Sequence, residues 1–203
     1  MAYVKILNIT CNNSYLQAAV DYAARPDKTI LERLETANEY IVNEKKTELD
    51  EVRYADCLNL SSLDSAAQEM LNTKIAWGKT DGRLGYHVIQ SFAPDDNITP
   101  EVAHEIGMQY ARELFSDFEV VVGTHVDRAH IHNHIIINSV AIKDGHKAHF
   151  QKGYLHTVLR NVSDRYCKEH GLSTISYTKD YEMKQSDWYN RHWQKGSMKE
   201  SIN

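Results

Sequence analysis

The chain contains 203 residues, of which 42% are hydrophobic and 25% are charged, and its formal net charge is −5 at pH 7. A chain of this length and composition can bury the core of one large domain, and its negative charge excludes a uniformly basic coat for nucleic acid. The sequence contains no run of about 18 apolar residues, so no membrane span is predicted.

The first residues and the cysteines bear on the cellular compartment. Residues 1–9 read as a strand and lack the apolar core and cleavage site of a signal peptide. Cys11, Cys57 and Cys167 are odd in number and widely spaced, which fits a reducing compartment better than a disulfide framework. We therefore expect a cytoplasmic protein.

Charge is unevenly divided along the chain. Residues 142–170 carry six Lys and Arg against three Asp and Glu, whereas residues 1–50 carry six against eight. We therefore expect a local phosphate-binding surface on the histidine-rich side of the molecule, to which Lys147, Lys152 and Arg160 could contribute.

Hydrophobic periodicity, prolines and capping residues predict alternating strands and helices. The first half is expected to hold a strand at 3–9, a helix at 14–24 that Pro26 ends, a polar surface helix or flap at 31–50 and a helix at about 62–77. The second half is expected to hold a strand at 84–92, a helix at 100–115, strands at 118–124 and 130–138, and a helix at 153–169.

This order predicts an α+β fold, with one mainly antiparallel sheet, helices packed on one face, and the other face left for a ligand. Residues 1–178 are expected to form one domain. Residues 179–203 interleave Tyr and Trp with Lys and Arg, and we expect a helical or extended appendage that begins a truncated C-terminal region.

Four histidines and an aspartate fall between His125 and His134. On a strand, His130, His132 and His134 point to one face because side chains alternate with a period of two. A single histidine here would be read as an ordinary polar strand residue, but three in alternation with His125 nearby predict a metal site.

Residue types narrow the kind of metal site. No cysteine or glutamate ligand pair lies nearby, so a structural zinc site is not indicated, and the signature of zinc peptidases is absent. The remaining interpretation is a catalytic ion that holds a substrate oxygen, with a phosphate as the most oxygen-rich candidate. Imidazole ligands suit Zn²⁺, Co²⁺ or Ni²⁺ as well, but we expect Mn²⁺ or Mg²⁺ because availability often decides.

Three segments resemble the motifs of one family, in the family's order. The stretch His-Val-Asp-Arg-Ala-His-Ile-His-Asn-His from His125 resembles the third motif of the relaxases of plasmids and conjugative elements, which are DNA-nicking mobilization proteins of the histidine-hydrophobic-histidine endonuclease superfamily. Residues 21–28, Asp-Tyr-Ala-Ala-Arg-Pro-Asp-Lys, resemble the first motif of the branch that includes the agrobacterial border nuclease. Residues 86–92 resemble the intervening second motif, which carries a DNA-contacting serine.

The resemblance implies a role for each matching residue. His125, His132 and His134 match the metal ligands, Asp127 matches the acid that supports the first histidine, and Tyr22 matches the nucleophile. His130 is expected beside the ligands, and Tyr15 is the reserve nucleophile. Ser91 matches the serine of the second motif that contacts DNA. We expect further DNA contacts from basic residues, namely Arg25, Lys28, Lys147, Lys152 and Arg160. The metal site and the DNA cleft are expected on the face of the sheet that the helices leave open.

The implied activity is nicking and rejoining of one DNA strand at an origin of transfer. Tyrosine attack would give a 5′-phosphotyrosyl enzyme and a free 3′-hydroxyl. The implied partners are single-stranded or hairpin origin DNA in a bacterial cytoplasm, an accessory relaxosome protein and a conjugative coupling protein. Two alternatives remain open, namely a rolling-circle replication initiator of the same superfamily and a metal-binding DNA-recognition protein that does not nick.

Overall fold

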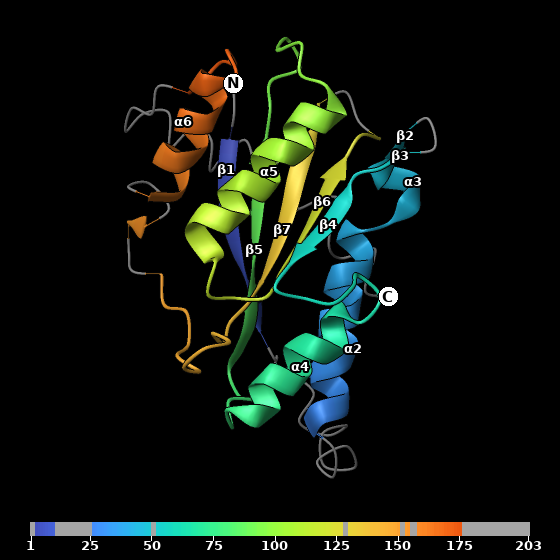
Figure 1. Cartoon of the computed structure of the whole chain (residues 1–203), viewed down its shortest axis with the longest axis vertical. Coiled ribbons are helices and arrows are strands. Elements are labelled where there is room, and N and C mark those ends of the chain that lie inside the picture. Colours follow the sequence, from blue (N-terminus) through green and yellow to red (C-terminus); the bar gives the residue numbers. More distant parts are fainter. Residues whose placement is uncertain are drawn as a thin grey trace, which may run out of the picture.

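The computed structural model describes residues 3–10, 26–49, 52–127, 130–150, 153–154 and 158–175. Five strands form one antiparallel sheet in the order β1-β5-β7-β6-β4 (Figure 1). These strands are β1 (Tyr3–Thr10), β4 (Ala55–Leu58), β5 (Arg83–Ser91), β6 (Val120–His125) and β7 (His132–Asn138). A separate hairpin pairs the two-residue strands β2 (Glu48–Leu49) and β3 (Val52–Arg53).

The helices are α2 (Pro26–Ile41), α3 (Glu44–Thr47), α4 (Ala66–Ala76), α5 (Pro100–Phe115) and α6 (Arg160–Glu169). In α5 the hydroxyl of Thr99 accepts a hydrogen bond from the Val102 N–H at 3.4 Å, and Pro100 occupies the first helical position. Among the described residues, no helix is long and apolar enough to cross a membrane.

The central strand β7 is buried along its whole length. Ile135 and Ile137 pack into the core beneath α5 together with Val120 and Val122 of β6. Ile136 points to the opposite face, where it packs with Val121. A strand whose faces are both covered reads as a continuous apolar run, which explains the Ile triplet.

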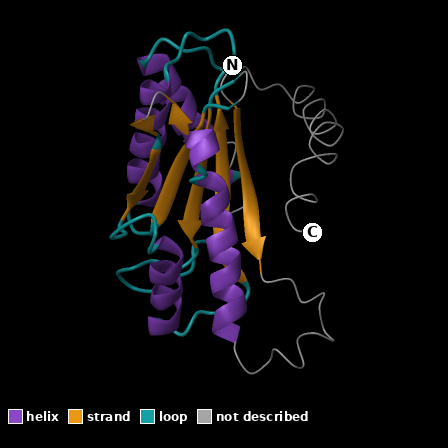
Figure 2. Cartoon of the chain, turned by 90° about the vertical axis from the view of Figure 1, so that its right-hand side faces the viewer, coloured by secondary structure: helices purple, strands orange, loops and turns teal. Residues whose placement is uncertain are grey.

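The α+β class and the antiparallel sheet are confirmed, but helices cover both faces and not one. The helices α5 and α6 belong to the core on the Ile135 face, whereas α2 and α4 pack on the Ile136 face. In Figure 2 the sheet is seen from the β4 edge, with α2 in front of the strands and α4 below them. The segment expected as a polar flap buries Leu34 and Ile41, which lie seven residues and two turns apart, completely.

Two elements also differ from the expectation. Pro26 begins α2, in agreement with the preference of proline for the first turn of a helix, and the expected helix at 14–24 lies outside the described residues. The edge strand β4 had no counterpart in the sequence-based prediction. It is four residues long, and its burial shows no clear alternation.

Gly123 allows α2 to approach the sheet closely. A Cβ atom on Gly123 would overlap the carbonyl oxygen of Ile41, the last residue of α2. Only glycine therefore lets the end of this helix rest directly on β6. This contact fixes where α2 ends relative to the neighbouring strand residues.

We expect Gly123→Ala to destabilise the protein by about 1–3 kcal/mol, because overpacking a close contact forces backbone shifts. Urea unfolding of the two proteins measures this difference. Gly171→Ala serves as control, since its Cβ would meet nothing within 4 Å and only its positive φ of 70° is strained. Asn should partly rescue position 171 but not position 123, and an unchanged unfolding midpoint for Gly123→Ala would contradict the account.

Candidate metal centre

The sheet register brings three histidines together on the face that carries α2. His125 of β6 pairs with His132 of β7, and the next pair on the same face, two residues along, is Gly123 with His134. One nitrogen from each of the three rings lies within 4.8 Å of the other two. The three residues are only 1 to 4% exposed, so these rings form a buried cluster.

Each ring has its second nitrogen held by a neighbour. Nε2 of His125 donates to the carbonyl of Ile41 at 3.2 Å, and Nδ1 of His132 donates to the carbonyl of His130 at 3.2 Å. Nδ1 of His134 lies 2.7 Å from Nε2 of His87. Because a carbonyl can only accept, the first two contacts place the ring proton on the bonded nitrogen and leave Nδ1 of His125 and Nε2 of His132 as ligand atoms.

The cluster could hold a metal ion. Within the described part of the chain, Nε2 of His134 is buried without a hydrogen-bond partner, which costs free energy unless a ligand satisfies it. Two nitrogens bound to one ion at about 2.1 Å lie at most about 4.2 Å apart, so a small closure of the rings is needed. His125, His132 and His134 are therefore the residues that could hold a metal.

Burial keeps the rings ready to bind a cation. Burial, with neighbouring histidines and Lys46, lowers the pKa of His125 to about 4, and it lowers the pKa of His134 well below its usual value. A neutral imidazole offers the lone pair that a metal requires. The C-terminal end of α2 also favours a cation at this place, because the last carbonyls of a helix carry partial negative charge.

Asn133, which lies between His132 and His134 on β7, anchors this strand on the opposite face of the sheet. Asn133 donates to Ala103 O at 2.7 Å and to Gln90 Oε1 at 3.0 Å, and it accepts from the Thr124 hydroxyl at 2.6 Å. A Cβ on Gly107 would lie 2.6 Å from the Asn133 amide nitrogen, so glycine makes room for this side chain on α5. The ligand strand is thus fixed on its far face by fully buried polar contacts.

Four residues around the cluster were not in the predicted site. The ring of Tyr40 packs edge-on against His125 and His134, and Lys46 lies over the Tyr40 ring with its Nζ 4.0 Å from the centroid. Lys5 pairs with Ile89 on the same face, and burial lowers its pKa to about 8. His87 is the fourth.

The sequence offered only one indication of these four residues. His87 shares a face of the predicted strand with Ser91, whereas Tyr40 and Lys46 belong to a polar stretch in which no pattern singled them out.

The supporting residues of the histidine motif take different places. Asp127 is exposed beyond the end of β6, and its charge is the smallest of the effects on the pKa of His125. His130 precedes β7, since the strand begins at His132 and not at residue 130 as expected. Its ring centroid lies 5.2 Å from that of His132, but His130 does not belong to the group of histidines whose nitrogens lie within 4.8 Å of one another.

The predicted DNA contacts are dispersed. Ser91 pairs with His132, so the second-motif serine lies in the same cross-strand row as two of the clustered histidines. Lys147 bonds to Asp81, just before the opposite end of β5, and Arg160 is 7% exposed in α6, a helix of the other face. Lys28 lies in the first turn of α2. Four of the predicted site residues lie outside the described part of the chain, namely Tyr15, Tyr22, Arg25 and Lys152.

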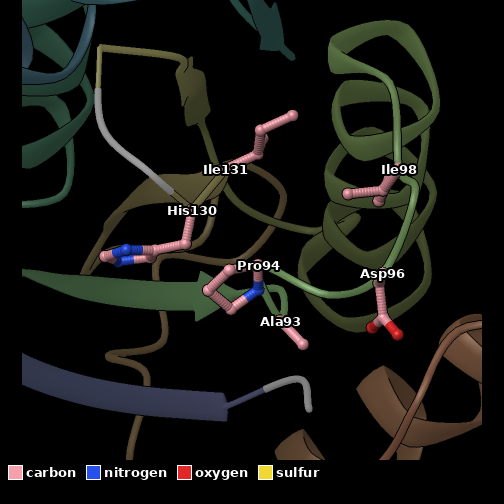
Figure 3. Close-up of a pocket in the computed structure, with 6 residues that line it drawn as sticks. All are labelled: Ala93, Pro94, Asp96, Ile98, His130 and Ile131. Atoms are coloured by element: carbon pink, nitrogen blue, oxygen red, sulfur yellow. The ribbon is translucent and has the colours of Figure 1, made fainter.

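A hollow opens beside the cluster at the end of β5 (Figure 3). It is lined by Ala93, Pro94, Asp96, Ile98, His130 and Ile131. The carboxylate of Asp96 accepts bonds from the backbone N–H and the hydroxyl of Ser173. His130 is one of the residues that line the hollow, and its ring centroid lies 5.2 Å from that of His132.

We expect the metal-free protein to lose stability as the pH falls from about 6.5 toward 4. His125 titrates at about 4 in the folded chain, so between those values the unfolded chain binds more protons and unfolding becomes easier. Each such histidine contributes up to about 1.4 kcal/mol per pH unit. Urea unfolding across this range measures the slope. Added Mn²⁺ should shift the fall to lower pH, and a flat profile would contradict the burial of neutral rings.

Comparisons with known proteins agree with this geometry. Residues 40–172 match the model of the relaxase family described as MobA/VirD2-like, nuclease domain. The chain is 31% identical to the group II intron-interrupted relaxase LtrB of Lactococcus lactis subsp. cremoris over 94% of its length and 37% of that protein. It is 40% identical to protein rlx of Staphylococcus aureus over 55% of its length and 33% of that protein.

A solved structure supports the fold. The chain in the structure titled "Molecular Basis of Vancomycin Resistance Transfer in Staphylococcus aureus" aligns with a TM-score of 0.51 over 87% of this chain and all of that one, at 12% identity. The present chain spans about a third of the length of the curated relatives. With the family model matching well over half of its residues around three clustered histidines, the chain belongs to the MobA/VirD2-like relaxases and contains their nuclease domain.

Proposed function

We propose that this chain nicks and rejoins one DNA strand at an origin of transfer, through a 5′-phosphotyrosyl intermediate, to start conjugative mobilization. The observation that carries the proposal is the buried cluster of His125, His132 and His134 in a relaxase nuclease domain. Ser91 in register with His132 supports it, because the second motif then borders the cluster.

A divalent cation held by the three histidines would neutralise charge on the scissile phosphate. In the proposed reaction the phenolic oxygen of Tyr22 bonds to phosphorus while the bond to the 3′-oxygen breaks. The phenolic proton leaves Tyr22, and the departing 3′-oxygen takes up a proton. The ester keeps the bond energy, so the reverse attack by a 3′-hydroxyl reseals the strand without ATP.

Described side chains supply cationic and aromatic groups at this face. Lys46 and Lys5 flank the cluster from α3 and β1, and both are suited to contact phosphate oxygens. Tyr40 forms one wall against His125 and His134. We propose single-stranded or hairpin DNA as substrate.

We further propose two protein partners, an accessory relaxosome protein and a conjugative coupling protein. The relaxase domain is proposed to end near residue 178. The expected ion is Mn²⁺ or Mg²⁺.

The fold sets a condition for the nucleophile. The last turn of α2 touches the cluster through Ile41, and its first residue, Pro26, lies about 22 Å away along the helix axis at 1.5 Å per residue. The proposal therefore requires that the chain before Pro26 return toward the histidines to present Tyr22. This condition makes Tyr15, the reserve nucleophile, the natural control.

Tyr22→Phe should abolish the covalent protein–DNA adduct and leave DNA binding within about twofold, because only the attacking oxygen is lost. The assay mixes protein, Mn²⁺ and a labelled single-stranded oligonucleotide carrying the origin of transfer of the element that encodes the chain. Denaturing gels report the adduct, and retardation gels report binding. Tyr15→Phe is the matched control and should keep the adduct. An undiminished adduct from Tyr22→Phe, with none from Tyr15→Phe, would move the nucleophile to Tyr15.

His132→Ala should lower metal-dependent cleavage by at least about a hundredfold. The variant lacks one of the three proposed ligands, so the ion that would neutralise charge on the scissile phosphate is held less tightly. His146→Ala is the control, since this exposed histidine bonds to Asp144 far from the cluster. Both rates are measured with the same oligonucleotide over a titration of Mn²⁺. Equal cleavage by His132→Ala and the unchanged protein would remove the cluster from the reaction. Retarded DNA without any adduct from the unchanged protein would favour a non-nicking DNA-recognition protein.

A further inference from the structure

A fourth histidine lies directly behind one of the three clustered rings. His87 is on β5 and is 5% exposed, and its Cα pairs with Ile136, two residues along β7 from His134. The two ring centroids are 4.9 Å apart with a 37° tilt, and the Nε2–Nδ1 distance is 2.7 Å. This is a direct hydrogen bond between two buried imidazoles.

A hydrogen bond between two neutral rings holds one proton, which can sit on either nitrogen. If it sits on Nδ1 of His134, that residue's Nε2 carries a lone pair and can bind a cation. If His87 donates instead, the His134 proton moves to Nε2 and blocks ligation. Nε2 of His134 has no hydrogen-bond partner within the described residues, so this atom is the one turned toward the cluster.

The other two clustered rings do not face this choice. His125 and His132 each donate to a backbone carbonyl, which accepts only, so their tautomers are fixed by the fold. Metal-binding histidines generally donate their second N–H to a carboxylate, a carbonyl or water. For His134 the partner is instead the imidazole of His87, and this ring must accept the hydrogen bond if His134 is to bind metal.

We propose that His87 is a positioning residue of the metal centre, which accepts the hydrogen bond of His134 and thereby holds its Nε2 as a ligand atom. The inference rests on the metal site of the proposed function. It assigns a role to a residue that does not touch the ion, and it predicts that removing the acceptor weakens metal binding even when the three clustered histidines are intact.

The test is titration of the metal-free chain with Mn²⁺ by calorimetry and with Co²⁺ by visible absorption. His87→Leu keeps a side chain of similar size but removes the acceptor, and it should weaken binding about 10- to 100-fold, the usual effect of losing such a partner. His87→Gln places an amide oxygen near the position of Nε2 and should restore most of the affinity and the Co²⁺ spectrum. His87→Asn is too short to reach His134 and should resemble His87→Leu, which provides a second variant if the leucine variant does not fold.

Tyr86→Phe is the matched control. Tyr86 is the neighbouring residue on β5, and its hydroxyl donates to Ala148 O at 2.9 Å on the opposite face. This variant loses a buried hydrogen bond and some thermal stability, but its Mn²⁺ affinity and Co²⁺ spectrum should not change. A purely structural role for His87 would likewise lower the melting temperature alone.

The outcomes separate this inference from the proposed function. If the unchanged chain binds Mn²⁺ and His87→Leu and His87→Asn bind it equally well, the positioning role is wrong while the metal site stands. If the unchanged chain binds neither ion, the metal site itself is wrong and the inference falls with it. Weakened binding in both variants with rescue by glutamine supports the assignment.

Discussion

The contact between the carbonyl of Ile41 and the bare backbone at Gly123 is the constraint on which the site depends. It sets the end of α2 against β6, and the same carbonyl accepts the hydrogen bond of His125. Without this close approach, Tyr40 would not reach the rings of His125 and His134. A single position without a side chain therefore links the packing of a helix to the orientation of one ring of the histidine cluster.

The face of the sheet that carries the histidines is divided along its strands. Val121 and Ile136 form a cross-strand pair beneath the apolar sides of α2 and α4. The next pair on the same face is Gly123 with His134, and the pair after that is His125 with His132. Burial of the apolar part stabilises the fold, whereas burial of the imidazoles in the polar part costs free energy. Hydrogen bonds to the second ring nitrogens reduce that cost. On the reverse face, Asn133 and its partners hold β7 in register, so that His132 and His134 on either side of Asn133 stay aligned.

The sequence predicted the features that depend on local pattern. Alternating histidines followed by isoleucines correctly predicted β7 and its pairing with β6, and the cap at Thr99 correctly predicted the start of α5. What it could not predict depends on register and packing between distant segments. His87 meets His134 only because β5 pairs with β7 in one register, and Tyr40 belongs to a stretch whose burial comes from α4. The basic residues Lys147 and Arg160 were placed with the histidines on composition alone, and composition does not determine which face or end of a sheet a side chain occupies.

The central claim is that three imidazoles, each oriented by its own hydrogen-bond acceptor, form one metal centre. Anomalous X-ray diffraction from crystals of the Mn²⁺-loaded chain tests it most directly. The account predicts one strong peak bonded to Nδ1 of His125, Nε2 of His132 and Nε2 of His134, with Ile41 O, His130 O and His87 still bonded to the other ring nitrogens. A peak at other residues, or ligation through the opposite nitrogens, would contradict it.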